Sequence, residues 1–172
     1  ENDRDLNWMQ NTYAVIKDYL AVDECQMIEA ELEFQASTDW KKLPKGVIHA
    51  DLFCDNAMFH GDVLSGIIDL YYACNSTLLY DLAVMVNDWC RVHADNPAEI
   101  EFDQKRIDVM LSAYQTQRSL TEQEQAAWPA ALRLAALRFF LSRLKDKHIP
   151  REGEMTQIKD PEVFKRVLQL HQ

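Results

Sequence analysis

Glycine is scarce in this sequence, with only four among 172 residues. Gly46, Gly61, Gly66 and Gly153 form neither a GxGxxG nor a GxxxxGK[S/T] pattern, the spacings by which glycine-rich loops bind nucleotide phosphates. Phosphate loops of the Rossmann and Walker types are therefore excluded within these residues.

Long hydrophobic runs and paired cysteines are lacking as well. No uncharged apolar stretch approaches the ~20 residues that a membrane helix requires, and residues 1–20 have neither the basic segment nor the apolar core of a secretory leader. The four cysteines form no CxxC pair, so the sequence predicts neither a zinc ribbon nor a disulfide framework. We expect reduced thiols and a cytoplasmic location.

Basic residues are outnumbered by acidic ones, 18 to 28, which gives a net charge of −10. That charge repels nucleic acids and anionic membranes, so neither is expected as a partner. It also repels ATP, so phosphate chemistry here would require a divalent cation. With 48% apolar and 27% charged residues, the composition is typical of a soluble globular domain.

Apolar residues at alternating spacings of three and four predict amphipathic helices over much of the chain. The expected ranges are 6–20, 23–32, 78–90, 107–114, 121–144 and 160–170. Asp23 with Gln26, and Thr121 with Glu124, are predicted capping boxes. Pro129 is expected to kink the long fifth helix or to mark its start, and the acidic run 29–33 to be a solvated helix face.

The helical pattern is interrupted between residues 46 and 70 by short β-branched and apolar segments. These are residues 46–49, 57–59 and 64–70, and the last two flank His60-Gly61-Asp62, a composition typical of a hairpin turn. The predicted fold class is a single, mainly α domain with a small β-hairpin region.

The residues most suggestive of chemistry lie in this middle region. Residues 49–56 have the pattern H-x-D-x-x-x-x-N, and thirteen residues later Asp69 ends an apolar strand. Phosphoryl transfer to a hydroxyl group needs an acceptor for the hydroxyl proton and cations that bridge the transferred phosphate. Asp51 is predicted to take or orient that proton. Asn56 and Asp69 are predicted to hold Mg²⁺, which prefers oxygen ligands.

Several strings of the sequence are similar to those of one enzyme group. They are His49–Asn56, Ile68–Cys74, Leu79–Ala83, Asn87–Cys90, Arg138–Leu144 and Asp160-Pro161. The first two resemble the catalytic loop and metal-binding strand of the aminoglycoside phosphotransferase–choline kinase group of eukaryotic-kinase-like enzymes. Together the strings resemble the bacterial homoserine kinases of that group, over nearly the whole chain.

This resemblance implies the C-terminal lobe of a protein-kinase-like fold and ATP-dependent phosphorylation of the L-homoserine hydroxyl, a step of threonine biosynthesis. It implies Asp51 as catalytic base, Asn56 and Asp69 as Mg²⁺ ligands, and ATP as co-substrate. Asp81 would be the buried carboxylate that supports the catalytic loop. The wider group usually has Gly at position 50 and His at position 53, whereas Ala50 and Phe53 fit the homoserine kinase branch.

Kinases of this group have an N-terminal, strand-rich lobe with a lysine that binds ATP. The present sequence has no glycine-rich loop and opens with the helices expected after the interlobe hinge. We therefore expect residues 1–172 to form one domain that lacks the nucleotide-binding lobe and is inactive alone. The apolar face that the missing lobe would cover also makes self-association an expectation.

Six further residues are candidates for the site. His49 is predicted to bond loop carbonyls, and Asp81 to pair with loop N–H groups, because a buried carboxylate requires such partners. Asp55 is a candidate contact of the substrate amine, against a solvent-facing alternative, and Trp89 of the substrate pocket, against a core position. Arg138 and Arg143 lie five residues apart on the long helix, and one of them, Arg138 in the first place, is a candidate clamp for a substrate carboxylate, against a solvated or ion-paired surface position for either.

Two other functions compete with the homoserine kinase hypothesis. The first is a kinase of the same group that acts on choline, an aminoglycoside or a sugar; aromatic residues would favour choline through cation–π contacts, whereas a free carboxylate requires an arginine. The second is a non-catalytic helical interaction module on the same scaffold.

Overall fold

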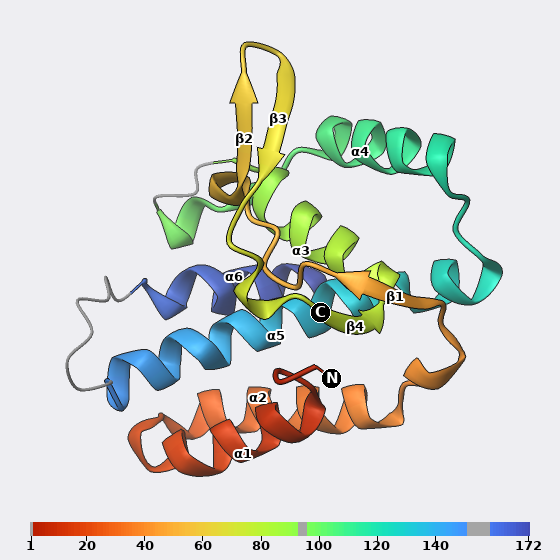
Figure 1. The fold of residues 1–172 in the computed structure, drawn as a ribbon. Helices are drawn as coiled ribbons and strands as arrows, with labels where there is room; N and C mark the ends of the chain where they lie inside the picture. The colour runs from red at the N-terminus through yellow and green to blue at the C-terminus, as the bar shows by residue number, and fades with distance from the viewer. Residues whose placement is uncertain (1, 93–95, 151–158) are drawn as a thin grey trace.

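The computed structural model describes residues 2–92, 96–150 and 159–172 (Figure 1). The helices are α1 (Leu6–Ile16), α2 (Val22–Ser37), α3 (Leu78–Trp89), α4 (Gln104–Gln117), α5 (Glu122–His148) and α6 (Pro161–His171). The strands are β1 (Lys45–Ile48), β2 (Ala57–His60), β3 (Val63–Ile67), β4 (Cys74–Thr77), β5 (Arg91–Val92) and β6 (Glu101–Phe102). The mainly α prediction with a small hairpin region is confirmed. Of the described helices, none combines the length and apolarity needed to cross a bilayer.

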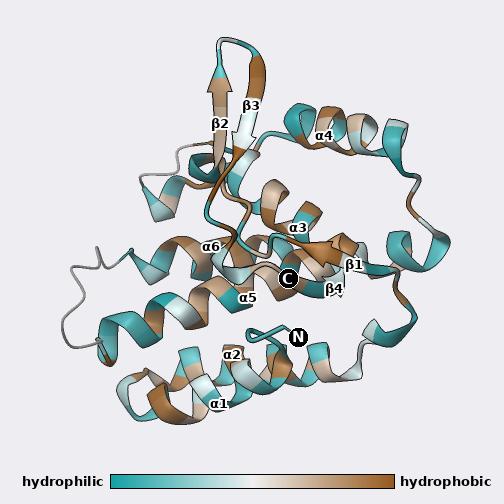
Figure 2. Ribbon diagram, viewed as in Figure 1, coloured by the Kyte–Doolittle hydropathy of each residue, from teal (hydrophilic) through white to brown (hydrophobic). Residues whose placement is uncertain are grey.

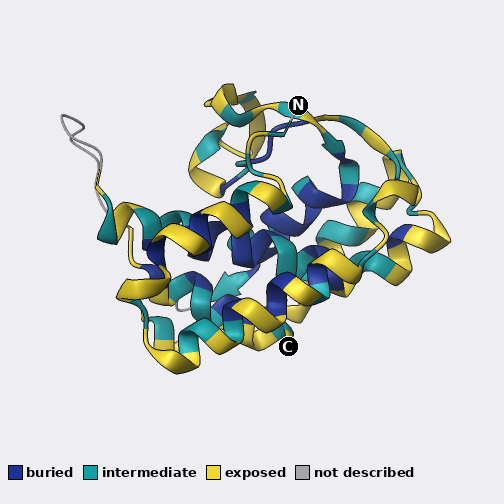
Figure 3. Ribbon diagram, turned by 90° about the horizontal axis from the view of Figure 1, so that it is seen from below, coloured by how far each residue is buried: buried dark blue, intermediate teal, exposed yellow. Residues whose placement is uncertain are grey.

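The long helix α5 organises the core. It packs against α6, α3, α1 and α2, and its residues Ala135, Ala136 and Phe140 are fully buried. Figure 3 shows the buried residues along the facing sides of the helices, with exposed residues on their outer sides. Alanines on this face allow the neighbouring helices to approach α5 closely.

The helix ends follow local capping rules, with one correction. The predicted box at α5 is confirmed, because Thr121 Oγ1 accepts from the Glu124 N–H at 3.2 Å and the Glu124 carboxylate accepts from the Thr121 N–H at 2.9 Å. The predicted cap at Asp23 is wrong: α2 begins at Val22, and the Glu24 carboxylate accepts from the Ala21 N–H at 3.3 Å. Asp23 instead places its negative charge in the first turn, where the helix dipole favours it.

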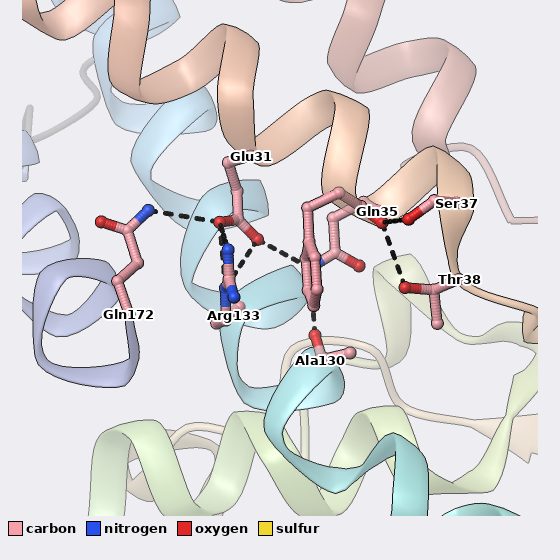
Figure 4. Close-up of polar contacts among 8 residues, drawn as sticks. Glu31, Gln35, Ser37, Thr38, Ala130, Arg133 and Gln172 are labelled. Atoms are coloured by element: carbon pink, nitrogen blue, oxygen red, sulfur yellow. Dashed lines mark hydrogen bonds and ion pairs between the residues drawn. The ribbon is translucent and has the colours of Figure 1, made fainter.

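Two other expectations about the helices also differ from the structure. α5 begins at Glu122, seven residues before Pro129, so the proline does not mark its start. The acidic run of α2 is not uniformly solvated, because Glu31 is fully buried. Figure 4 shows the cause: Arg133 of α5 reaches the Glu31 carboxylate, which also accepts from Gln35 and Gln172. A partner 102 residues away overrides the local pattern.

Two strand pairs position the residues of interest. β2 and β3 form the predicted hairpin, which projects from the helical body (Figure 1), with its turn at Gly61 at φ 60°. β1 pairs with β4, which the sequence analysis missed, in the register Lys45↔Thr77 to Ile48↔Cys74. Figure 2 shows hydrophobic residues on the projecting hairpin as well as inside the helical body.

The last helix, α6, is fastened to the body through a buried polar contact. The Asn87 side chain of α3 donates to the Leu132 carbonyl of α5 at 2.8 Å and accepts from His171 Nε2 at 2.8 Å. The His171 ring also packs against Phe102, with centroids 4.8 Å apart. Burial lowers the pKa of His171 from 6.5 to about 4. The folded protein therefore holds His171 in its neutral form.

The pKa of His171 predicts a loss of stability in mild acid. Below pH 6.5 the unfolded chain protonates this histidine while the folded chain does not until pH 4, so the unfolded state binds more protons in that window. Above pH 6.5 this histidine does not lower the free energy of unfolding. Between pH 6.5 and pH 4 it lowers the free energy of unfolding by up to about 3 kcal/mol. Urea unfolding across this range is expected to show a smaller decline for His171→Gln, which keeps a donor for Asn87 but does not titrate. Equal declines would contradict the prediction.

Candidate active site

The loop after β1 is held in an unusual backbone conformation by one carboxylate. Ala50 has φ 65°, in the left-handed region that costs a non-glycine residue about 1–2 kcal/mol. Asp81, in the first turn of α3, accepts from the His49 N–H at 2.7 Å and from the Ala50 N–H at 2.8 Å. These contacts fix the loop, and the positive φ is the physical reason why glycine would suit position 50.

Asp51 lies at the centre of the region, half-buried, with Arg138 beside it. The Arg138 guanidinium, itself 3% exposed, donates from Nη1 to Asp51 Oδ1 at 3.2 Å. Burial raises the pKa of Asp51 above its ordinary value, the positive charge of Arg138 opposes this rise, and the negative charge of Asp69 adds to it. Asp51 is therefore a carboxylate whose basicity is increased by its surroundings.

Asn56 and Asp69 are joined to the same loop through backbone contacts. Asn56 lies in the 3₁₀ turn Cys54–Asn56, and its side-chain N–H donates to the Asp51 carbonyl at 2.8 Å. Its own carbonyl accepts from the Ile68 N–H at 3.0 Å. Because the amide nitrogen donates to the loop, the amide oxygen is the atom of this side chain that is available to bind a ligand. Exposed Asp69 follows Ile68 in a left-handed conformation, with φ 61°.

His49 ties the loop to the end of the hairpin. Its Nδ1 accepts from the Asp51 N–H at 3.3 Å, and its Nε2 donates to the Ile68 carbonyl at 2.8 Å. These partners assign the neutral Nε2–H tautomer, in which both ring nitrogens are engaged. The structure therefore brings His49, Asp51, Asn56 and Asp69 together, with His49 in a bracing position.

Trp89 and Asp55 make contacts that do not involve Asp51. Trp89 Nε1 donates to the Leu52 carbonyl at 3.1 Å, and Asp55 is exposed, 3.7 Å from Lys159. Neither lines the cavity beside Asp51. The sequence analysis did not assign a role to Asp88, which accepts from the Cys54 N–H at 2.8 Å and so braces the same turn. The only signal was its place in the Asn87–Cys90 string.

A cavity of about 370 Å³ opens beside Asp51. Its lining includes Phe53, Tyr72, Arg138 and Phe139, together with Ser142 and Arg143 further along α5 and Lys159. The alternative expectation, that Arg138 forms an ion pair at the surface, is therefore wrong. Arg138 is buried between Asp51 and the rings of Tyr72 and Phe139. The cavity places Asp51 within reach of a small molecule.

The donors present fit a cation of the Mg²⁺ type. Within the described residues, no three His, Cys, Asp or Glu side chains gather into a group that could hold a metal ion. Mg²⁺, however, is usually bound by one or two side-chain oxygens together with substrate phosphates and water. One carboxylate, Asp69, and one amide oxygen, Asn56, meet that requirement.

Comparison with known proteins gives the family. Residues 3–108 match the model of the phosphotransferase enzyme family. The chain belongs to this family. Among its curated relatives are the homoserine kinases of Methylobacillus flagellatus, 48% identical over 97% of this chain, and Neisseria meningitidis serogroup B, 40% identical over 98%. These alignments cover 51% and 53% of the relatives, so the chain spans about half their length.

A solved structure supports the fold of this phosphotransferase chain. The ethanolamine kinase of Plasmodium vivax superposes with a TM-score of 0.65 over 96% of this chain and 47% of its own, at 14% sequence identity. The likeness is therefore one of fold. It confirms the prediction of a kinase-like lobe that is mainly helical.

Proposed function

We propose that the intact protein is a homoserine kinase. The observation that carries this proposal is the shared loop: the Asn56 amide is bonded to the Asp51 carbonyl, and Asp69 follows a residue bonded to both Asn56 and His49. A proton acceptor and two candidate Mg²⁺ ligands therefore converge, as phosphoryl transfer requires. The names of the relatives supply the acceptor, L-homoserine.

The proposed reaction transfers the γ-phosphoryl group of ATP to the hydroxyl group of homoserine. The hydroxyl oxygen of homoserine forms a bond to the γ-phosphorus of ATP, the bond from that phosphorus to the β,γ-bridging oxygen breaks, and ADP leaves with the electron pair. The hydroxyl proton passes to Asp51, whose pKa is raised by burial. Arg138 orients the Asp51 carboxylate through its single hydrogen bond. The products are O-phospho-L-homoserine, ADP and one proton.

Charge neutralisation would come from Mg²⁺. When bound, it offsets the charge of the β- and γ-phosphates. Asn56 would offer its amide oxygen and Asp69 its carboxylate. Asp81 and Asp88 would act indirectly, by holding the backbone that positions Asp51 and Asn56.

The activity is proposed for the intact protein because the chain spans about half the length of its relatives. No glycine-rich phosphate loop can be written from its four glycines. We infer that residues outside 1–172 hold much of the nucleotide, and that residues 1–172 alone show no turnover.

The test is a panel of acceptors with the intact protein, ATP and Mg²⁺, read by ³¹P NMR. Homoserine is expected to be phosphorylated in preference to choline, ethanolamine, an aminoglycoside and a sugar. Asp69→Asn should raise the Mg²⁺ concentration for half-maximal rate, because it removes a charged ligand. Asp62→Asn removes the same charge at the exposed hairpin tip, and it therefore controls for the general effect of losing one carboxylate.

Two results would contradict the proposal in different ways. Preference for another acceptor would indicate a different kinase of the same family. No Mg²⁺-dependent binding of nucleotide to the intact protein would favour the non-catalytic interaction module.

A further inference from the structure

The cavity beside Asp51 concentrates positive charge in an acidic protein. Five cationic side chains line it, against two acidic ones, Asp51 and Asp146. The cationic residues are Arg4, Arg138, Arg143, Lys145 and Lys159. The chain as a whole carries a net charge of −10. A cleft whose local charge is opposite to that of the chain attracts a ligand of the opposite sign, here an anion.

Two of these arginines have donor groups that the protein does not pair with a carboxylate. Arg138 contacts Asp51 through Nη1, but its Nε is buried and has no hydrogen-bond partner among the described residues. Arg143 donates to the Asp160 carbonyl at 2.8 Å and lies over the Phe164 ring, and within the described part of the chain it forms no ion pair. A bound anion would therefore give the Arg138 Nε–H a hydrogen-bond acceptor and give the half-buried Arg143 a direct ionic partner.

Arg143 is half-buried and has charged groups around it. Burial lowers the pKa of Arg143 to about 10, and the neighbouring charge of Arg91 acts in the same direction. At neutral pH the guanidinium remains charged. The carboxylates of Asp88, Asp160 and Asp51 oppose this lowering, but Asp88 is paired with Arg91 at 2.6 Å and Asp51 with Arg138 at 3.2 Å.

Asp51, Arg138 and Arg143 all line the same cavity. Arg143 follows Arg138 by five residues, a rise of about 7.5 Å along a helix. In homoserine the hydroxyl oxygen and the carboxylate are about 5 Å apart, given carbon–carbon bonds near 1.5 Å. Because Asp51 and Arg143 line one cavity, an acceptor whose hydroxyl faces Asp51 can extend its carboxylate toward Arg143.

We propose that this cavity is the acceptor site and that Arg143, with Lys159 at its rim, binds the acceptor's carboxylate. The inference rests on the proposed function and specifies its substrate class: a zwitterionic amino-acid alcohol rather than a purely cationic one such as choline or ethanolamine. Arg143 is thereby a specificity residue that touches substrate. Arg138 is a positioning residue for Asp51.

The test compares L-homoserine with 3-amino-1-propanol, the same amino alcohol without its carboxylate, in the intact protein. The wild type is expected to bind homoserine roughly 10- to 100-fold more tightly, the usual effect of a charged hydrogen-bonded pair. Arg143→Gln should abolish most of this difference and leave the KM for ATP unchanged. Lys159→Gln, at an exposed position, should produce a smaller change in the same direction. Lys147→Gln is the control, an exposed charge of α5 outside the cavity.

Calorimetric titration of both compounds separates this inference from the proposed function. Binding of homoserine with the expected preference but without phosphorylation would contradict the kinase proposal alone. Equal binding of the two compounds by the wild type would overturn the inference. If Arg143→Gln weakens the binding of both compounds equally, Arg143 has a structural role. If it raises only the KM for ATP, the anion bound by Arg143 is a nucleotide phosphate. Either result overturns the inference.

Discussion

Replacement of Asp51 by Asn in the intact protein is expected to lower the turnover number about 10²- to 10⁴-fold, the usual contribution of a general base. Asparagine keeps the shape of the side chain and an acceptor for Arg138, but it cannot take a proton. The KM for ATP should change little if, as proposed, Asp51 contacts the acceptor and not the nucleotide. Steady-state kinetics with homoserine and ATP measure both quantities.

The pH profile provides an independent check on Asp51. Burial raises its pKa, so the wild-type rate should begin to fall with acid at a higher pH than an ordinary aspartate would cause. The residual rate of Asp51→Asn should lack that acidic limb. Asp62→Asn is the matched control and should retain the wild-type rate. A loss smaller than about fivefold for Asp51→Asn would remove this residue from the mechanism.

The candidate site was predictable from sequence only where its residues are close in the chain. Asp51 and Asn56 share one loop, and a hairpin returns the chain to Asp69, so their spacing carried the information. The partner of Asp51 is Arg138, 87 residues away. No local spacing relates the two, and the sequence alone indicated only a candidate carboxylate clamp. Arg143 and Lys159 converge on the cavity through the packing of α5 and α6, which no periodicity encodes.

The fold shows the same division. Helices with an apolar face were predicted because their periodicity is local. β4 was missed because it has four residues of mixed character, and its pairing with β1 joins Lys45 to Thr77 across the chain. The start of α2 depends on the Glu24 carboxylate, which accepts from the Ala21 N–H. The expected cap at Asp23 lies two residues beyond the observed N-cap, Ala21. The α2 acidic run was predicted to be a solvated face because nothing near Glu31 in the sequence indicates its partner, Arg133, which lies in another helix.

Removal of that partner should have the largest effect on stability. Arg133→Met is expected to lower the free energy of unfolding by about 3–5 kcal/mol, because it leaves the fully buried Glu31 carboxylate without its counter-charge. Gln35 and Gln172 would still donate to this carboxylate, at 2.8 Å and 3.2 Å (Figure 4), but neutral amides do not compensate its charge. Methionine keeps the aliphatic part of the side chain, but the contact of the Arg133 guanidinium with the Phe34 ring is lost as well. Urea unfolding monitored by circular dichroism measures the change.

A double variant separates the lost charge from lost packing. Glu31→Leu combined with Arg133→Met replaces the ion pair by two apolar side chains of similar volume, an exchange that is often neutral or stabilising. The double variant should therefore recover most of the stability lost in Arg133→Met. Lys42→Met, which removes one partner of the exposed ion pair with Asp39, should leave the unfolding midpoint unchanged. If the double variant is as unstable as Arg133→Met, packing rather than an uncompensated carboxylate accounts for the loss, and the buried charge does not hold α2 against α5.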